Sequence, residues 1–210
     1  MEKWSNYEIM KDKMHHQFLE YDQDAMIERF ALKHDDDYIY IRFFDRQYRI
    51  NRRDGGVTWT DDGFVHSGDA GYNEAMTIYD VLCCSKPCCR ASGEFCPHDS
   101  LSGMVNTGHI TKSGGLFEKF RDSFSGRTEA LRAACLPMGG TPQGKADVEY
   151  RIPMFDFLSV VLSFWDEDDE FPAQLQIMLD KNVLDFMHYE TTWFASSYML
   201  ERLESKIVNA

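Results

Sequence analysis

Residues that favour β-strands are confined to two blocks of the sequence, and helix-forming segments lie before, between and after these blocks. In the first block, residues 38–59, aromatic and β-branched residues alternate with polar ones around a glycine turn at 54–56. The second block holds three apolar runs at 148–152, 158–165 and 175–179. This segregation of strands from helices favours an α+β fold over a parallel sheet built by regular β-α alternation.

Segments with helical periodicity account for most of the remaining chain. Residues 5–32 predict two helices with a break before Asp22, which is expected to cap the second of them. Further helices are predicted at 73–84, at 116–135 with a break in the middle, and at 191–207. We therefore predict an α+β fold with a mixed or antiparallel sheet of about six strands and with helices at both chain ends and in the middle.

Composition and charge limit the class of protein. A hydrophobic fraction of 43% in 210 residues is enough for one domain over residues 1–210 that folds without a metal or a disulfide. The net charge of −13 repels phosphate backbones and anionic lipid heads, so we expect neither nucleic acid nor a membrane as a partner. The polar start and the lack of an apolar run of about 20 residues predict a cytoplasmic location.

Five of the six cysteines lie between positions 83 and 96, and a histidine follows them. In a cytoplasmic protein such residues are reduced thiols or metal ligands. The candidate ligands of a zinc ion or an iron–sulfur centre are Cys84, Cys88, Cys96 and His98. Their spacing contains no C-x-x-C pair and fits no standard metal motif. The alternative is that Cys83 and Cys84 are small core residues that close a helix, with the other cysteines in a loop.

Two groups of charged residues are candidates for binding a small ligand. Asp168 and Glu170 lie in an acidic turn that precedes Asp180, and clustered carboxylates can hold Mg²⁺ or Ca²⁺. Arg42 and Arg49 lie on expected strands, where guanidinium groups can bind a small anion. If these two groups converge in a cleft, they form one binding site. The alternatives are a solvated turn that blunts a sheet edge and an exposed sheet face.

Several sequence blocks resemble the family known as domain of unknown function 3786. The most specific is the Asp-Glu-Phe-Pro run at 169–172 with the Leu-Asp pair at 179–180, and blocks at 38–44 and 76–82 are also similar. The resemblance extends over nearly the whole chain. It implies an uncharacterised protein of anaerobic bacteria and archaea, and the family pattern does not require the cysteines at 83–96. No catalytic residue follows from it.

The sequence thus favours an accessory or small-ligand-binding module in anaerobic metabolism, because it carries no catalytic motif and is rich in aromatic residues. A metal- or thiolate-dependent enzyme and a structural interaction protein are the alternatives. The sequence alone does not decide whether the chain is an enzyme, and it identifies no cofactor. The expected partner is a small-molecule ligand or a metabolic enzyme.

Overall fold

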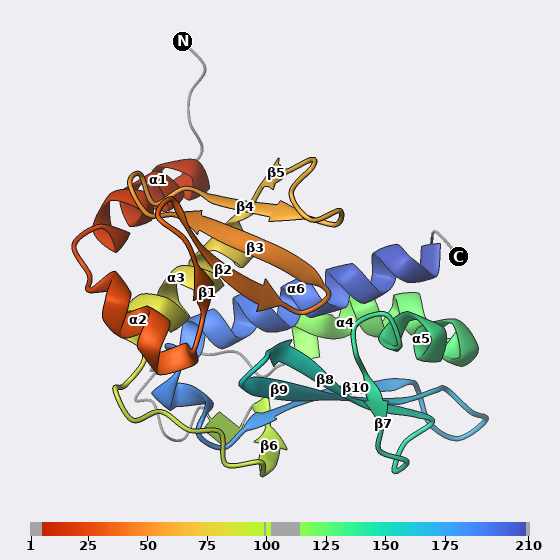
Figure 1. Ribbon diagram of the computed structural model, residues 1–210. Helices are drawn as coiled ribbons and strands as arrows, with labels where there is room; N and C mark the ends of the chain where they lie inside the picture. The colour runs from red at the N-terminus through yellow and green to blue at the C-terminus, as the bar shows by residue number, and fades with distance from the viewer. Residues whose placement is uncertain (1–5, 99, 102–113, 209–210) are drawn as a thin grey trace.

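The computed structural model describes residues 6–98, 100–101 and 114–208. These residues form six α-helices and two antiparallel sheets of five strands each (Figure 1). The predicted α+β class is confirmed, with helices near both ends and in the middle. The strands differ from the prediction in one respect, because they divide between two sheets instead of forming a single sheet of about six.

Two helices open the described chain, α1 (Asn6–Phe18) and α2 (Gln23–Phe30). As predicted, Asp22 caps the second helix, since its Oδ1 accepts a hydrogen bond from the backbone N–H of Ala25 at 3.0 Å. Ala31 ends α2 in the left-handed conformation, with φ of 50°. The chain then turns into the first sheet.

The first sheet is a meander in which each strand pairs with the next along the chain. Its strands are β1 (Lys33–His34), β2 (Tyr38–Phe43), β3 (Arg46–Asn51), β4 (Val57–Thr60) and β5 (Gly68–Asp69). Burial alternates along β2, and its buried Ile39 and Ile41 lie opposite the buried Ile50 and Tyr48 of β3. One face of this sheet therefore belongs to the core.

The second sheet has the strand order β6-β10-β9-β8-β7. Its strands are β6 (Phe95–Pro97), β7 (Thr141–Pro142), β8 (Val148–Phe155), β9 (Leu158–Trp165) and β10 (Gln174–Asp180). The three long strands match the predicted apolar runs. The edge strand β6 was not predicted, because three residues that end in proline show no strand periodicity.

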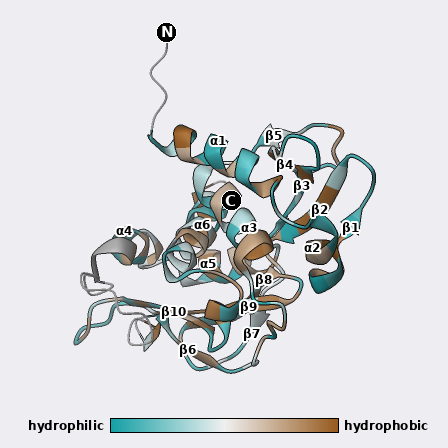
Figure 2. Cartoon of the chain, turned by 90° about the vertical axis from the view of Figure 1, so that its left-hand side faces the viewer, coloured by the Kyte–Doolittle hydropathy of each residue, from teal (hydrophilic) through white to brown (hydrophobic). Residues whose placement is uncertain are grey.

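Four further helices complete the fold. These are α3 (Tyr72–Cys84), α4 (Gly114–Phe124), α5 (Thr128–Cys135) and α6 (Tyr189–Val208), and a 3-10 turn at Val183–Asp185 precedes α6. Helix α6 contacts α3, α4 and α5. Seen from the side, α3 and α6 lie between the first sheet and the second (Figure 2).

A stack of aromatic rings joins the two sheets. Phe43 of β2 lies parallel to Tyr198 of α6, with ring centroids 5.1 Å apart, and to Phe155 of β8 at 5.0 Å. Beside it, the backbone N–H of Phe44 donates a hydrogen bond to the carbonyl of Met154 at 2.8 Å. The buried apolar residues form one connected cluster that includes both sheets. The relative position of α3 and α6 is therefore set by a shared core.

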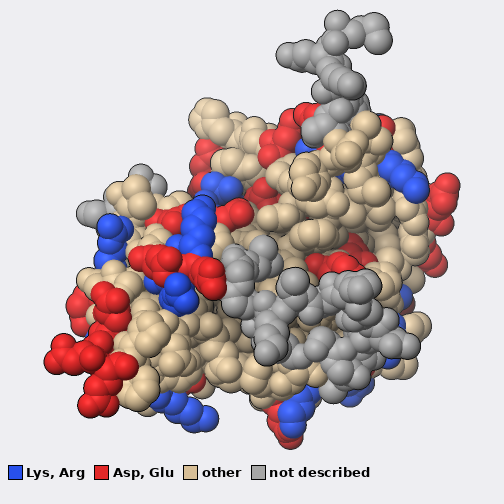
Figure 3. All heavy atoms as spheres, turned by 180° about the vertical axis from the view of Figure 1, so that it is seen from behind, with Lys and Arg blue, Asp and Glu red and all other residues tan. Residues whose placement is uncertain are grey.

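The surface reflects the acidic composition. In the view from behind, acidic side chains are scattered and gather at the lower left, at the turn between β9 and β10 (Figure 3). Within the described part of the chain, no helix combines the length and the apolar character that crossing a bilayer requires.

Candidate metal centre

Asp80, Cys84 and His188 each bring one metal-ligating atom to the same point, and these atoms all lie within 4.8 Å of one another. Asp80 and Cys84 are four residues apart on α3 and therefore share one face of the helix. His188 directly precedes α6, and the packing of α6 on α3 brings it to this face. Among the residues that the structure describes, no other group of three or more His, Cys, Asp or Glu meets the same criterion.

The Asp80 carboxylate is the fixed element of this site. Its side chain is mostly buried, and both oxygens contact His188: Oδ1 lies 2.6 Å from the imidazole Nδ1, and Oδ2 accepts a hydrogen bond from the backbone N–H at 2.7 Å. The backbone contact orients the carboxylate whether or not the imidazole is protonated. Oδ2 is thus held in place, while Oδ1 contacts the imidazole.

The Cys84 thiol lies beside Asp80 and the hydroxyl group of Tyr21. Desolvation by the surrounding protein, and then the negative charge of Asp80, raise the pKa of Cys84 to about 11. Without a metal, the thiol is therefore protonated at neutral pH. A bound cation would displace this proton, because only the thiolate is a metal ligand.

The donor set fits a borderline-soft divalent cation. A thiolate, an imidazole and a carboxylate are the ligands of zinc sites, and three protein ligands leave a fourth tetrahedral position open. In such a site Asp80 would bind through Oδ1 and keep Oδ2 on the backbone of His188. The His188 side chain is 66% exposed and Cys84 is also exposed, so an ion can reach the site from solution.

Of the predicted metal ligands, only Cys84 belongs to this group. Cys88 is exposed in the loop after α3, and Cys96 lies on the edge strand β6 opposite Leu179 of β10. Pro87 lies between Cys84 and Cys88 and prevents the helix from continuing. The chain therefore leaves α3 and joins the second sheet. Closeness in sequence therefore does not become closeness in space.

His98 is placed differently again. It is 3% exposed and lies among aromatic rings, with the Trp193 centroid at 3.9 Å. Its Nε2 lies 3.0 Å from the Thr192 hydroxyl. The structure thus does not gather Cys84, Cys88, Cys96 and His98 into one site.

The predicted ligand-binding residues also lie apart, beginning with the two arginines. Arg42 of β2 is paired at 2.6 Å with Asp156, which lies in the turn between β8 and β9. Arg49 lies over the rings of Tyr38 and Phe64, 4.3 and 4.5 Å from their centroids. Arg42 therefore joins the first sheet to the second, whereas Arg49 packs on the surface of the first sheet.

The acidic residues of the same prediction have local partners. Asp168 accepts hydrogen bonds from the backbone N–H groups of Glu170 and Phe171, which caps the exposed turn between β9 and β10. Asp180 is buried and accepts hydrogen bonds from backbone N–H groups, among them that of Ser92 at 3.0 Å. Asp180 thus anchors the loop before β6. The structure does not bring these carboxylates together with Arg42 and Arg49.

Two of the three residues of the candidate centre were missed from the sequence. The pairing of Asp80 with Cys84 could have been predicted from the sequence, because both lie on the helix predicted at 73–84 with a spacing of four residues. The position of His188 could not have been predicted, because it depends on how α6 packs against α3.

A second polar cluster lies at the N-terminal end of α3. The Tyr48 hydroxyl donates to Glu74 Oε1 at 2.5 Å and lies 2.7 Å from the Tyr198 hydroxyl. Burial raises the pKa of both tyrosines. Glu74 Oε2 also accepts from the N–H of Gly71 at 2.5 Å, so this carboxylate joins the first sheet, α3 and α6.

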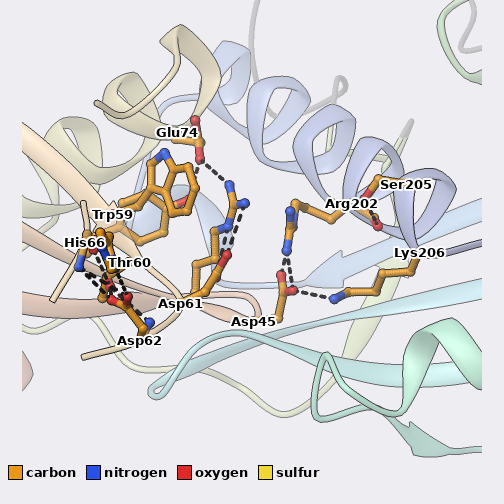
Figure 4. A network of polar contacts seen from close by, with 12 residues as sticks. Asp45, Trp59, Thr60, Asp61, Asp62, His66, Glu74, Arg202, Ser205 and Lys206 are labelled. Carbon is orange, nitrogen blue, oxygen red and sulfur yellow. Dashed lines mark hydrogen bonds and ion pairs between the residues drawn. The ribbon is translucent and has the colours of Figure 1, made fainter. Parts of the chain in front are cut away.

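Further charged side chains lie along the first sheet and α6 beside this cluster, where Arg202 and Lys206 point at Asp45 (Figure 4). Arg46 lies 3.6 Å above the ring of Trp59 and pairs with Asp61 at 3.3 Å. Arg202 and Lys206 of α6 both contact Asp45 at 2.7 Å. Burial tends to raise the pKa of Asp45, but the hydrogen bonds from these two cations outweigh it and lower the pKa. These contacts tie α6 to the first sheet.

Comparison with known families gives a match to Domain of unknown function (DUF3786) over residues 22–202. This region contains all three residues of the candidate centre. Searches of curated proteins and of solved structures gave no match. Because the match covers most of the chain, the protein belongs to the DUF3786 family.

Proposed function

We propose that the protein is an accessory module that binds a zinc-class divalent cation through Asp80, Cys84 and His188. The observation that carries the proposal is the convergence of a carboxylate, a thiol and an imidazole within 4.8 Å. The open position on the cation would take water or a small anionic ligand. The place of such a module in anaerobic metabolism rests on the resemblance described above.

The exposure of the site favours an accessory role. Two of its three ligands reach solvent, so the cation can be loaded from solution and passed to a partner. A structural zinc site usually has four protein ligands and is closed. One connected apolar cluster joins both sheets, and none of the three candidate ligands belongs to it. Metal binding therefore serves a role other than folding.

The Cys84 thiol distinguishes this site from an ordinary ion pair. His66 and Asp62 also form a contact, at 2.7 Å, on the exposed loop after β4, but no cysteine completes a group there. If His188 and Asp80 only pinned α6 to α3, the third donor would have no role. Because the cysteine is what sets the Asp80–His188 pair apart from the Asp62–His66 pair, Cys84 is the residue to test.

Cobalt titration of the reduced protein under anaerobic conditions is the test. We expect one equivalent of Co²⁺ to bind with a sulfur-to-cobalt charge-transfer band, and one equivalent of Zn²⁺ to displace it. Cys84→Ser should remove the band. Cys88→Ser, which changes another exposed cysteine nearby, should keep it. Failure to bind one equivalent, or an unchanged band in Cys84→Ser, would contradict the proposal.

The number of protein ligands at the proposed metal site supports a second candidate function. Three ligands and an open position are the arrangement of catalytic zinc, which lowers the pKa of its bound water. A hydrolytic enzyme is therefore the alternative function. Ester or phosphoester hydrolysis that appears with Zn²⁺ and disappears in Cys84→Ser, but not in Cys88→Ser, would favour it.

A further inference from the structure

A cavity of about 330 Å³ lies at the opposite end of α3 from the candidate metal centre, between the start of α1 and the middle of α6. Aromatic rings and two carboxylates dominate its lining. The residues concerned are Tyr7, Tyr72, Phe194, Tyr198, Glu74 and Glu201. A cavity of this size falls within the range that holds small molecules, which begins at roughly 300 Å³.

Three of the rings form adjoining walls. The Tyr7 and Tyr72 centroids are 4.8 Å apart at an interplanar angle of 63°, and Tyr72 and Phe194 are 5.5 Å apart at 76°. Tyr7 is 65% exposed, so this large apolar ring stands at the mouth of the cavity. The rings thus border a pocket that opens to solvent beside Tyr7.

The carboxylates give the cavity negative charge. Glu74 lies below the rings, where its two oxygens accept from Tyr48 and from the N–H of Gly71. The second of these bonds neutralises the positive end of the α3 dipole. Glu201 is exposed on α6, and partial desolvation raises its pKa, an effect that Lys119 opposes and that Glu74 reinforces.

Three nearby cations lie outside the cavity, and one of them, Arg46, contacts one of its carboxylates. Arg46 pairs with Glu74 at 3.8 Å and also pairs with Asp61 and stacks on Trp59, so Glu201 is the carboxylate without this nearby arginine. Lys119 pairs with Glu204 at 3.6 Å. Lys11 donates a hydrogen bond to the carbonyl of Ala70 at 3.1 Å. None of these three cations lines the cavity.

We propose that this cavity binds a small organic cation of the methylated-ammonium class. A quaternary ammonium group is attracted to the faces of aromatic rings and to carboxylates, and its methyl groups bury apolar surface. Inorganic cations lack that apolar surface, and anions are repelled by Glu74 and Glu201. The site is separate from the candidate metal centre, and its function does not depend on a bound metal.

Choline is the probe that tests the proposal, with its neutral carbon isostere, in which a tert-butyl group replaces the trimethylammonium group, as the matched control. Ligand-observed NMR on the full chain measures the Kd of each. We expect choline to bind saturably and about fivefold to thirtyfold more tightly than the isostere, as a cation–π contribution of about 1–2 kcal/mol implies. Equal affinity, or no saturable binding of choline, would overturn the proposal.

Three variants locate the site. Phe194→Leu keeps an apolar side chain but removes a π face, and we expect it to weaken choline binding about fivefold to thirtyfold. Glu201→Gln should weaken binding about twofold to fivefold, since an exposed charge contributes less. Glu190→Gln changes an exposed carboxylate at the start of the same helix and should have no effect. If Phe194→Leu or Glu201→Gln binds choline as tightly as Glu190→Gln does, the site is not this cavity.

A trimethylammonium group can come from a free metabolite or from a methylated lysine side chain. Titration of choline in parallel with a short peptide that contains trimethyllysine separates these sources. Tighter binding of choline identifies the free metabolite, and tighter binding of the peptide identifies a modified protein as the ligand. Binding of neither overturns the proposal.

Discussion

The two ends of α3 face the same helix, α6, and carry different kinds of side chain. At the C-terminal end, Asp80 and Cys84 meet His188 in a compact group of three different donor atoms. At the N-terminal end, the Tyr48 hydroxyl links Glu74 to Tyr198 beside a wider cavity lined by aromatic rings. The two helices therefore run antiparallel and fix the spacing of both groups. Which side chains stand at each end decides between binding a metal and binding an organic cation.

The sharpest way to break this comparison is to remove one metal ligand. His188→Ala should weaken Zn²⁺ binding by more than about a hundredfold, because even changes to outer-shell partners of a metal site cost 10–100-fold. Competition with a chromophoric chelator measures the affinity. His66→Ala, which breaks the other exposed His–Asp pair, should leave it unchanged. Equal affinities in the two variants would show that His188 is not a ligand of the metal.

The proton on Cys84 gives the second test. Because its pKa is raised to about 11, zinc must displace this proton at every lower pH. Above the range in which histidine titrates, Zn²⁺ affinity should therefore increase about tenfold for each unit by which the pH rises, or about a hundredfold between pH 7 and 9. Affinity that does not change over this range would mean that no thiol proton is released and that Cys84 is not a ligand.

The carboxylate at the N-terminal end of α3 should also contribute to the stability of the fold. Glu74→Ala removes the carboxylate that accepts from both Tyr48 and Gly71, and we expect a loss of about 1–3 kcal/mol in the free energy of unfolding. Urea denaturation measures this loss. Glu190→Ala, on an exposed carboxylate of α6, should cost less than about 0.5 kcal/mol. Similar losses in both variants would show that Glu74 does not link the first sheet to the helices.

The smallest expected effect concerns the reactivity of the free thiol. Desolvation and the charge of Asp80 both raise the pKa of Cys84. Asp80→Asn removes the charge and keeps most of the burial, so the metal-free protein should be alkylated at Cys84 a few times faster. Peptide mapping after treatment with iodoacetamide measures the rate at this residue. An unchanged rate would mean that Asp80 does not affect the thiol.

Local patterns predicted the elements well because each pattern reports a face that must be buried. The helix at 73–84 and the strand at 158–165 appear almost unchanged as α3 and β9. Assignment of strands to sheets was beyond such patterns, since it depends on contacts between residues far apart in sequence. The pairing of Leu179 with Cys96 is an example.

The candidate site shows the same limit. Cys84 was predicted as a ligand together with the cysteines that follow it in sequence, whereas the structure places it beside Asp80 and His188. Pro87 ends the helical path, so the later cysteines lie away from Cys84. Asp80 lies four positions before Cys84 on α3, and the two side chains therefore share one face of the helix. The third ligand, His188, comes into place only through the packing of α6 on α3. Helical spacing thus offered a better guide than closeness in sequence.

The central claim is that one thiolate, one imidazole and one carboxylate bind the same cation. X-ray absorption spectroscopy at the zinc edge of the protein loaded with one equivalent of Zn²⁺ tests it most directly. We predict a four-coordinate shell with one sulfur at about 2.3 Å and three nitrogen or oxygen neighbours at about 2.0–2.2 Å. A shell without sulfur, or one with two or more sulfurs, would contradict the assignment of the site to Asp80, Cys84 and His188.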